Sequence, residues 1–192
     1  ICRHYGRGIE FYRYVCYIDY VSSISYPKIN EYIKLSDNES AFFAKQKEGL
    51  FRFLVTEYYA KLIQSSNCLP LRRQCIPAAE ELKESAQELE DPLGERFYSP
   101  LRRLVHRYEN RAVIKVTDNC ALYCRYCFRK VFTSGKCGTI SDDETSEICK
   151  YLRNYVKINQ VLLTGGDPLM LSDGRLEALI SRIREARPDI VI

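Results

Sequence analysis

The sequence lacks a long apolar run, a strong excess of one charge and a leader-peptide pattern. No stretch of roughly 18 apolar residues occurs, which argues against a membrane-spanning helix. The 29 Lys and Arg residues are spread among 25 Asp and Glu residues, and a net charge of +4 does not indicate a nucleic-acid groove. The first 30 residues are rich in tyrosine and interrupted by charges, unlike a signal peptide. We therefore expect a cytoplasmic protein that binds neither membrane nor nucleic acid.

Methionine is scarce as well. The chain contains only Met170, begins at Ile1, and stops at Asp189–Ile192, a tetrapeptide that reads as the opening of a buried strand. We expect the chain to be a piece of a longer protein. Its 192 residues, 46% apolar and 28% charged, can form one ordinary domain or a small domain with part of a larger one.

Cysteine, in contrast, is abundant. The odd count of nine argues against a disulfide framework and for a reducing cytosol. Three cysteines share one short run, CALYCRYCFR, as Cys120, Cys124 and Cys127. Zinc sites and closed iron–sulfur clusters normally take four protein ligands, so three thiolates would leave an inorganic centre open to a reactant. The other six are expected to be ordinary buried or half-buried thiols: Cys2, Cys16, Cys68, Cys75, Cys137 and Cys149.

Two other uses of these thiols remain open at this point. A zinc knuckle would need a fourth ligand, for which Cys137 is the nearest cysteine. A redox CxxC pair would not need Cys120. Tyr126 precedes the last cysteine of the run, and its ring could either face an adenine-like group or pack within the loop.

The first part of the chain, residues 1–105, is expected to be mainly helical and to end in a linker. A capping box at Ser36-Asp-Asn-Glu39 predicts a helix that continues to about Gln64, with Leu50 on its apolar face, and Cys68-Leu-Pro70 is expected to end this element. Pro77 is expected to open a second helix, AAEELKESAQELE, which Asp91-Pro92 ends. Residues 91–105 contain two prolines and a glycine and are typical of a linker.

The second part, residues 106–192, alternates strands with helices. We expect strands at 112–117, 160–164 and 189–192, with one helix starting at the capping box Ser141-Asp-Asp-Glu144 and another at Ser172-Asp173. Such a βαβαβ run predicts an α/β fold with parallel strands, whose functional loops lie at the carboxyl ends of the strands. The cysteine run and the sequence Gly165-Gly166-Asp167 both follow strands, so we expect them at the same rim.

The Gly-Gly-Asp sequence allows two interpretations. A glycine pair lets the backbone approach a ligand closely, and the carboxylate of Asp167 could hold an ammonium group. The plainer interpretation is a tight turn capped by the aspartate. Four arginines also flank the first strand and the cysteine run, where they could bind phosphate or carboxylate or simply remain solvated: Arg107, Arg111, Arg125 and Arg129. His106 is expected to be structural.

The runs CALYCRYCFR and LLTGGDPLMLSD resemble the radical S-adenosylmethionine superfamily, and specifically the lysine 2,3-aminomutase family. The resemblance covers roughly residues 65–192. One departure is Arg102-Arg103, where the family usually has Pro-Gly. The implied fold is the first βαβαβ part of a partial (β/α)6 barrel whose C-terminal half is missing from this chain.

The resemblance also implies cofactors and residue roles. Cys120, Cys124 and Cys127 would ligate a [4Fe–4S] cluster. S-adenosyl-L-methionine would contact Tyr126, Gly165, Gly166 and Asp167. Pyridoxal 5′-phosphate would contact Arg107, Arg111 and Arg125, and Arg129 would pair with the carboxylate of the substrate.

The implied enzyme is an isomerase that converts L-lysine to β-lysine through a 5′-deoxyadenosyl radical and pyridoxal-assisted amino migration. Glutamate and arginine are other candidate substrates. The reductant would be a protein such as flavodoxin or ferredoxin. A homo-oligomer of the enzyme is compatible with the resemblance. No catalytic residue is assigned, because the lysine that anchors the pyridoxal group belongs to the missing part, and we expect the chain alone to be inactive. The alternatives are the β-lysine-forming enzyme associated with elongation factor P and a non-catalytic zinc-binding fragment.

Overall fold

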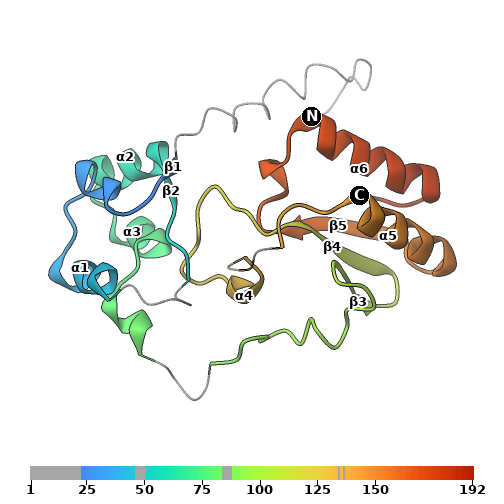
Figure 1. The fold of residues 1–192 in the computed structure, drawn as a ribbon, viewed down its shortest axis with the longest axis horizontal. Coiled ribbons are helices and arrows are strands. Elements are labelled where there is room, and N and C mark those ends of the chain that lie inside the picture. The colour runs from blue at the N-terminus through green and yellow to red at the C-terminus, as the bar shows by residue number, and fades with distance from the viewer. Residues whose placement is uncertain (1–22, 46–50, 84–87, 134, 136) are drawn as a thin grey trace.

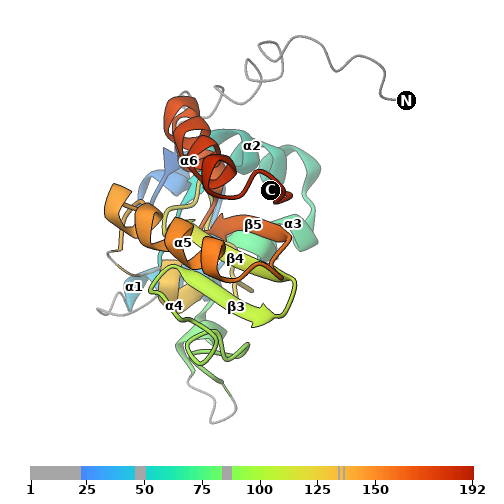
Figure 2. The same ribbon diagram turned by 90° about the vertical axis from the view of Figure 1, so that its right-hand side faces the viewer.

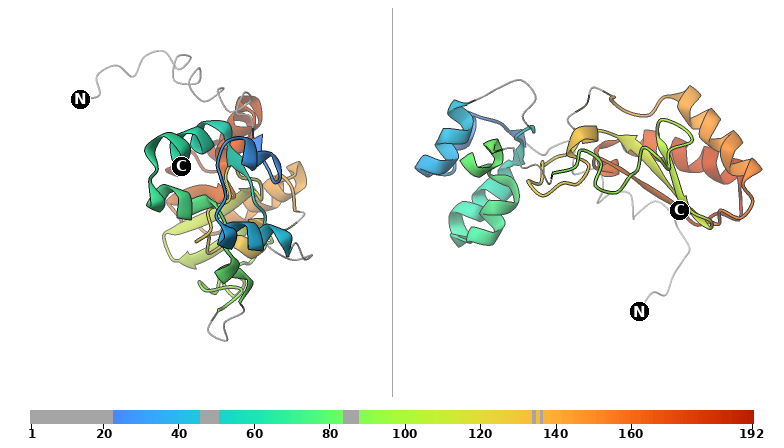
Figure 3. Two further views of the ribbon diagram at one scale, coloured as in Figure 1. Left: turned by 90° about the vertical axis from the view of Figure 1, so that its left-hand side faces the viewer. Right: turned by 90° about the horizontal axis from the view of Figure 1, so that it is seen from below.

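The computed structural model describes residues 23–45, 51–83, 88–133, 135 and 137–192. It is a mixed α/β structure in which a helical region and a sheet region lie at opposite ends of the molecule, as Figures 1 and 3 show. The segment after the second strand of the sheet runs from the sheet to the helical region and back. No helix in the described ranges is both long and apolar enough to cross a membrane.

The helical region contains three short helices and a two-stranded antiparallel sheet. These elements are α1 (Asp37–Ala44), α2 (Glu57–Ser66), α3 (Leu69–Cys75), β1 (Ser23–Ile24) and β2 (Val55–Thr56), with the 3-10 turns η2 (Lys28–Glu31) and η3 (Ala79–Leu82). Ile24, Ile29 and Val55 are fully buried in its core. The region therefore has its own apolar core.

The single long helix expected from Ser36 to about Gln64 is wrong. The capping box at Ser36 is confirmed, but the helix that it starts ends at Ala44. Val55 and Thr56 then pair with Ile24 and Ser23, and the Thr56 hydroxyl caps a new helix by accepting a hydrogen bond from the backbone of Tyr59. Apolar residues at helical spacing occur on both sides of this strand, which made two helices look continuous. Leu50, expected on the same helical face, lies outside the described residues.

The helix expected over residues 78–90 is also not observed. Within the described part of that range, only Ala79–Leu82 is helical, as a 3-10 turn, and residues 84–87 are not described. In addition, the expected stop at Cys68-Leu-Pro70 is in fact the start of α3, with the proline in its first turn. Proline fits a first turn because its missing N–H has no intrahelical partner there in any case.

The sheet region is built on three strands in the order β3 (Leu104–Tyr108), β4 (Arg111–Thr117) and β5 (Gln160–Gly165). β3 is antiparallel to β4, and β4 is parallel to β5. The helices α5 (Asp142–Asn154) and α6 (Asp173–Ala186) cover one face of the sheet, as Figure 2 shows. Short helices follow the two parallel strands, namely α4 (Lys130–Thr133) and η4 (Pro168–Met170).

Alternation along β4 assigns its two faces. Ala112, Ile114 and Val116 are buried in the core formed with α5 and α6. Because successive side chains point to opposite faces of a strand, Lys115 and Thr117 lie on the other face.

Several expectations for the sheet region are confirmed. The capping box at Ser141 starts α5, and the strand expected at 160–164 is parallel to its predecessor. The strand expected at the end of the chain is represented by a single parallel bridge between Gln160 and Val191. Strand β3 was not expected. Its first two residues, Leu104 and Val105, were assigned to the linker, and no strand was assigned to the residues that follow them. In the structure it pairs with β4 across a tight turn.

Candidate functional site

The cysteine loop, residues 118–129, begins where β4 ends. Its cysteines Cys120, Cys124 and Cys127 are free thiols of intermediate exposure. The loop turns at its end, where the backbone N–H of Cys127 donates to the carbonyl of Cys124 at 3.1 Å. The structure therefore presents all three thiols on one partly exposed loop.

The middle of this loop is held by the helical region. The backbone N–H of Tyr123 donates to the carbonyl of Leu54 at 3.1 Å, and that of Arg125 donates to the carbonyl of Gln74 at 2.7 Å. The Tyr123 ring is buried, and its hydroxyl accepts a hydrogen bond from Arg52. Sheet and helical region together thus fix the path of the loop.

The environment of Cys120 favours the protonated form of its thiol. Burial raises the pKa of Cys120 to about 12, and the negative charges of Asp167, Cys127 and Cys124 add to the effect. Deprotonation of such a thiol needs a cation nearby, because a bound metal centre reverses this electrostatic balance.

Three thiols on one loop have the donor chemistry of an iron–sulfur site. In the described residues, no group of three or more Cys, His, Asp or Glu side chains is positioned to hold a metal ion as it stands. The match of these residues to an iron–sulfur cluster therefore depends on the type and number of the donor atoms. Cys137, considered above as a fourth zinc ligand, instead places its thiol beside Arg102 and so raises the pKa of that guanidinium.

The Gly-Gly-Asp loop is hydrogen-bonded to the start of the cysteine loop. Gly166 N–H donates to the Thr117 carbonyl at 2.6 Å, and Asp167 N–H donates to the Asn119 carbonyl at 2.8 Å. A Cβ atom at Gly165 would lie 2.4 Å from the Thr117 oxygen, and one at Gly166 would lie 2.2 Å from the Asn119 oxygen. The glycines therefore allow the two loops to touch. The sequence predicted a close approach of the glycine backbone to a ligand, whereas the close approach seen in the structure is to another segment of the backbone.

Asp167 and Tyr126 both lie beside the cysteines. Asp167 Oδ1 accepts a hydrogen bond from Leu169 N–H at 3.0 Å, which caps η4 and matches the plainer of the two interpretations. The Tyr126 ring is 70% exposed, and the charge of Cys124 raises the pKa of its hydroxyl. An exposed ring is compatible with stacking on a ligand, and no packing role is seen for it.

Arg125 is engaged within the chain. Its guanidinium makes hydrogen bonds with both carboxylate oxygens of Glu81, the shortest at 2.6 Å, and donates to the Arg52 carbonyl at 2.7 Å. It also lies over the rings of Phe42 and Phe51. Its side chain is only 6% exposed, so in this structure Arg125 joins the cysteine loop to the helical region and is not available to a phosphate.

Arg129 is also paired with a carboxylate of the same chain. It forms a two-pronged ion pair with Glu95, with contacts of 2.6 and 3.0 Å to the Oε1 atom, and donates to Thr164 Oγ1 at 2.9 Å. Glu95 therefore occupies the guanidinium that the sequence assigns to a substrate carboxylate.

Arg107 and Arg111 lie at the other end of the sheet from the cysteine loop. Arg111 opens β4, and the loop follows its last residue, so about six strand residues or ~20 Å separate the two. Arg107 donates to the Leu93 carbonyl and lies over the ring of Tyr98. The structure does not bring these two arginines to the loop, and their role in cofactor binding stays a prediction. His106 Nδ1 lies 2.8 Å from the Tyr151 hydroxyl, a structural contact.

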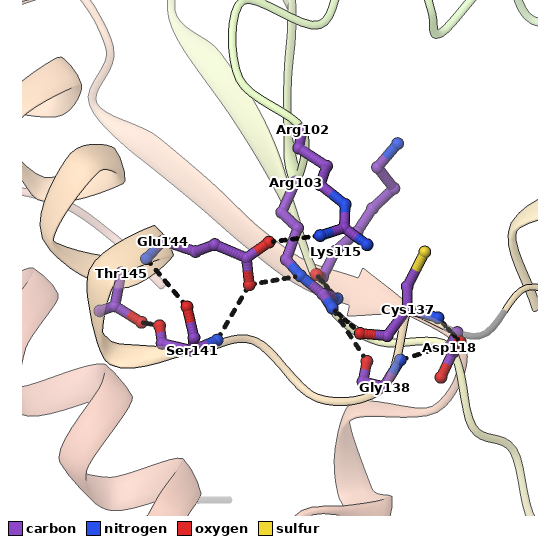
Figure 4. A network of polar contacts seen from close by, with 9 residues as sticks. All are labelled: Arg102, Arg103, Lys115, Asp118, Cys137, Gly138, Ser141, Glu144 and Thr145. Atoms are coloured by element: carbon purple, nitrogen blue, oxygen red, sulfur yellow. Dashed lines mark hydrogen bonds and ion pairs between the residues drawn. The ribbon is translucent and has the colours of Figure 1, made fainter.

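Sequence reasoning missed a buried polar network around Arg103, shown in Figure 4. The Arg103 side chain is 1% exposed and contacts Glu144 Oε2 at 2.9 Å, the Lys115 carbonyl at 3.1 Å and the carbonyls of Cys137 and Gly138 at 2.7 and 3.0 Å. The Asp118 carboxylate accepts from the N–H groups of the same two loop residues. The departure at Arg102-Arg103 was the only signal of this network in the sequence.

Two cavities adjoin these loops. One, of about 390 Å³, touches Asn119, Cys120, Tyr123 and Met170. The other, of about 350 Å³, lies between the linker and α4 and is lined by Lys115, Arg129 and residues of both segments. Lys115 was not considered in the sequence, where it is one charged residue within a β-branched strand.

Comparison with known proteins supplies the decisive observation. The model of the radical SAM superfamily matches residues 114–192, which begin in β4 and contain the three cysteines and the Gly-Gly-Asp loop. An L-lysine 2,3-aminomutase of Clostridium subterminale is 38% identical over 159 residues, which are 82% of this chain and 38% of that relative. The chain belongs to the lysine 2,3-aminomutase family of the radical SAM superfamily.

Other members of the family match this chain with similar identity and coverage. An L-lysine 2,3-aminomutase of Methanococcus maripaludis is 40% identical over 136 residues, 70% of this chain and 31% of the relative. A glutamate 2,3-aminomutase of Clostridioides difficile is 34% identical over 158 residues, 82% of this chain and 37% of the relative. The chain therefore spans less than half the length of these relatives. Membership of the radical SAM superfamily implies a [4Fe–4S] cluster and S-adenosylmethionine as the cofactors of the family.

Proposed function

We propose that this chain provides the cluster-binding and S-adenosylmethionine-binding part of an amino-acid 2,3-aminomutase that acts on L-lysine. The observation that supports the proposal most strongly is the contact between the two loops. Gly166 and Asp167 are hydrogen-bonded to Thr117 and Asn119, so the cysteine loop and the Gly-Gly-Asp loop meet at the carboxyl ends of two adjacent parallel strands. Ligands of open parallel sheets bind at such a rim.

In this proposal Cys120, Cys124 and Cys127 hold a [4Fe–4S] cluster. When bound, the cluster supplies the electron that cleaves S-adenosylmethionine and so starts hydrogen abstraction from the substrate. The chain itself orients the thiols by holding the loop at its start and in its middle. Asp167, whose charge already influences Cys120, would lie near the ammonium group of the methionine moiety, and the exposed Tyr126 ring would face the adenine.

Pyridoxal phosphate is part of the proposal through the family resemblance alone. The two cations that the structure brings near the rim, Arg125 and Arg129, are paired with Glu81 and Glu95. Either could take a ligand only by releasing its carboxylate. A flavodoxin or ferredoxin is proposed as the reductant, and the division at residue 105 into a helical part and a partial barrel is kept as part of the proposal.

The substrate is assigned as lysine because the relatives named as lysine 2,3-aminomutases share 36–40% identity with this chain. Glutamate is the second candidate, since one relative at 34% identity is a glutamate 2,3-aminomutase.

Anaerobic reconstitution of the chain with iron and sulfide tests the proposal. We expect about four irons per chain, broad absorption near 400 nm and an EPR signal after reduction, as a rough expectation for a [4Fe–4S] cluster. Cys124→Ser should abolish these signals, whereas Cys149→Ala should keep them because that cysteine packs between α5 and α6, away from the loop. A colourless protein that retains stoichiometric zinc would overturn the proposal in favour of a zinc-binding chain.

A further inference from the structure

Asp118 is a buried acid at the start of the cysteine loop. It directly follows β4, stands two residues before Cys120 and is 2% exposed. One of its carboxylate oxygens, Oδ2, accepts hydrogen bonds from the backbone N–H groups of Cys137 at 2.7 Å and Gly138 at 3.1 Å. Two successive N–H groups that converge on one anion form a nest, an anion-binding arrangement of the backbone. The segment before α5 therefore anchors the residue that leads into the cysteine loop.

The same two residues bind Arg103 through their carbonyls, at 2.7 Å for Cys137 and 3.0 Å for Gly138. The peptide group between them thus accepts a hydrogen bond from the guanidinium at its oxygen and donates one to Asp118 from its nitrogen, as Figure 4 shows. A cation at the oxygen of a peptide polarises the group and makes its N–H a stronger donor. Arg103, whose own ion pair is with Glu144, is therefore linked to Asp118 through a peptide group.

The segment that carries this peptide group is itself attached to β4. Thr139 forms an antiparallel bridge with Thr117, and the Ile140 N–H donates to the Val116 carbonyl at 2.8 Å. Both contacts lie at the carboxyl end of the strand, where the cysteine loop begins. Asp118 is therefore held by a segment that is fixed to the strand from which the loop departs.

Arg102 adds a second positive charge to the same segment. The Cys137 thiol contributes most to raising the pKa of Arg102, and the charge of Asp118 adds to the effect. Arg102 is 66% exposed and is screened by solvent, whereas the Arg103 side chain is 1% exposed. The sequence departure at these two positions therefore places one exposed and one buried cation beside the segment that binds Asp118.

A buried charge near a cluster ligand acts on the cluster through its electric field. In the proposed function Cys120 is such a ligand, and reduction adds one electron to the cluster. A fixed negative charge opposes that electron, and the opposition is strong where little water screens it. Net charge and solvent exposure around an iron–sulfur cluster are among the factors that set its reduction potential. The charge of Asp118 should therefore lower that potential, and the nearby arginines should raise it.

We propose that Asp118 is a positioning residue of the cluster site, and that Arg103 acts on it through the peptide group between Cys137 and Gly138. The carboxylate holds the start of the cysteine loop and lowers the reduction potential of the bound cluster, and Arg103 offsets its charge. The presence of a cluster rests on the proposed function. The linkage of Arg103 to Asp118 concerns the chain alone and is tested without iron.

The linkage is tested by NMR on the full 192-residue chain without iron. Asp118→Asn keeps an oxygen that can accept both N–H groups but removes the charge that strengthens these hydrogen bonds. The side-chain N–H protons of Arg103 should then exchange with water roughly threefold to tenfold faster. Arg187 provides the internal control, because its guanidinium is also largely buried and donates to the carbonyls of Leu152 and Ile158. The exchange of the Arg187 protons should not change.

The effect of the charge is tested on chains reconstituted anaerobically with iron and sulfide, by redox titration followed by EPR. Asp118→Asn should shift the midpoint potential to a more positive value, by roughly tenfold in the one-electron equilibrium or about 59 mV. Arg102→Met should shift it to a more negative value and by less, because this cation is exposed. Asp142→Asn removes an exposed acid at the start of α5 and should leave the potential unchanged.

Three results would overturn the inference. Unchanged exchange of the Arg103 protons in Asp118→Asn would show that the two residues are not linked, and an unchanged potential would show that the carboxylate does not act on the cluster. Shifts of the same sign in Asp118→Asn and Arg102→Met would indicate a loosened loop in place of an effect of charge. If no cluster forms in the unchanged chain, the proposed function fails, whereas the exchange of the Arg103 protons still decides the linkage.

Discussion

At the residue scale, the two glycines of the Gly-Gly-Asp loop are required by the chain itself before any ligand is considered. Gly165 has φ +124°, a conformation that residues with a side chain rarely adopt. Gly166 brings its backbone within hydrogen-bonding distance of the cysteine loop. A motif that is typical of ligand binding thus has a first role in joining two loops.

Alanine at either glycine should therefore destabilise the protein strongly. Gly165→Ala and Gly166→Ala should each lower the free energy of unfolding by about 2–4 kcal/mol, because the new Cβ atom would overlap a carbonyl oxygen. Urea denaturation gives the value.

Gly174→Ala is the matched control for these two variants. No atom lies within 4 Å of a Cβ built at Gly174, and the residue is in the first turn of α6, so alanine should be neutral or stabilising by about 0.5–1 kcal/mol. If all three variants were equally stable, the contact between the two loops would not be as the structure has it.

At the scale of elements, Arg103 ties four segments together. The linker supplies the arginine, β4 and the loop before α5 supply carbonyls, and the capping-box residue Glu144 of α5 supplies the carboxylate. Glu144 Oε2 also accepts the N–H of Ser141, so one oxygen serves both the helix cap and the arginine. The position of α5 on the sheet therefore depends on a residue outside both elements.

Replacement of Arg103 should be far more damaging than replacement of its neighbour. Arg103→Met leaves a partly buried carboxylate and several carbonyls without their donor, and should cost about 3–5 kcal/mol of unfolding free energy. Arg102→Met should cost much less, because Arg102 is 66% exposed and lies 3.6 Å from the same carboxylate. Equal losses in denaturation experiments would contradict the assignment of the network to Arg103.

At the scale of the whole molecule, the cysteine loop connects the helical region to the sheet. Its backbone is hydrogen-bonded to Leu54 and Gln74, and the side chain of Arg125 reaches Glu81. The helical region therefore supports the loop that carries the proposed cluster ligands, and its contribution to function would be to hold the thiols in place.

Weakening of the ion pair between Arg125 and Glu81 should loosen this connection. In Glu81→Gln, hydrogen exchange at the amides of Tyr123 and Arg125 should become roughly threefold to tenfold faster, since a charge-assisted hydrogen bond is lost. Glu57→Gln removes an exposed pair within α2 and should leave both amides unchanged. Unchanged exchange in Glu81→Gln would show that the backbone hydrogen bonds alone hold the loop.

Much of the sheet region could be predicted because its signals are local. The capping box at Ser141 starts a helix as expected, and the two strands that precede the motif loops are parallel. The capping box at Ser36, in the helical region, also starts a helix as expected. In the helical region the same local reasoning failed three times, at the strand containing Val55, at the helix containing Pro70 and at the helix expected over residues 78–90. Pairing of Val55 with a residue 31 positions earlier is not encoded in the spacing of its neighbours.

The sequence by itself determined the motifs, their position after parallel strands and the family of the chain. Only the tertiary structure decided which charged groups are free to act. Arg125 and Arg129 look equivalent to any other loop arginine in the sequence, yet their partners Glu81 and Glu95 lie 44 and 34 residues away. An ion pair depends on the distance between two groups in space, and burial decides its strength. For that reason the sequence pointed to the arginines as ligand-binding groups, and the structure shows that both are paired within the chain.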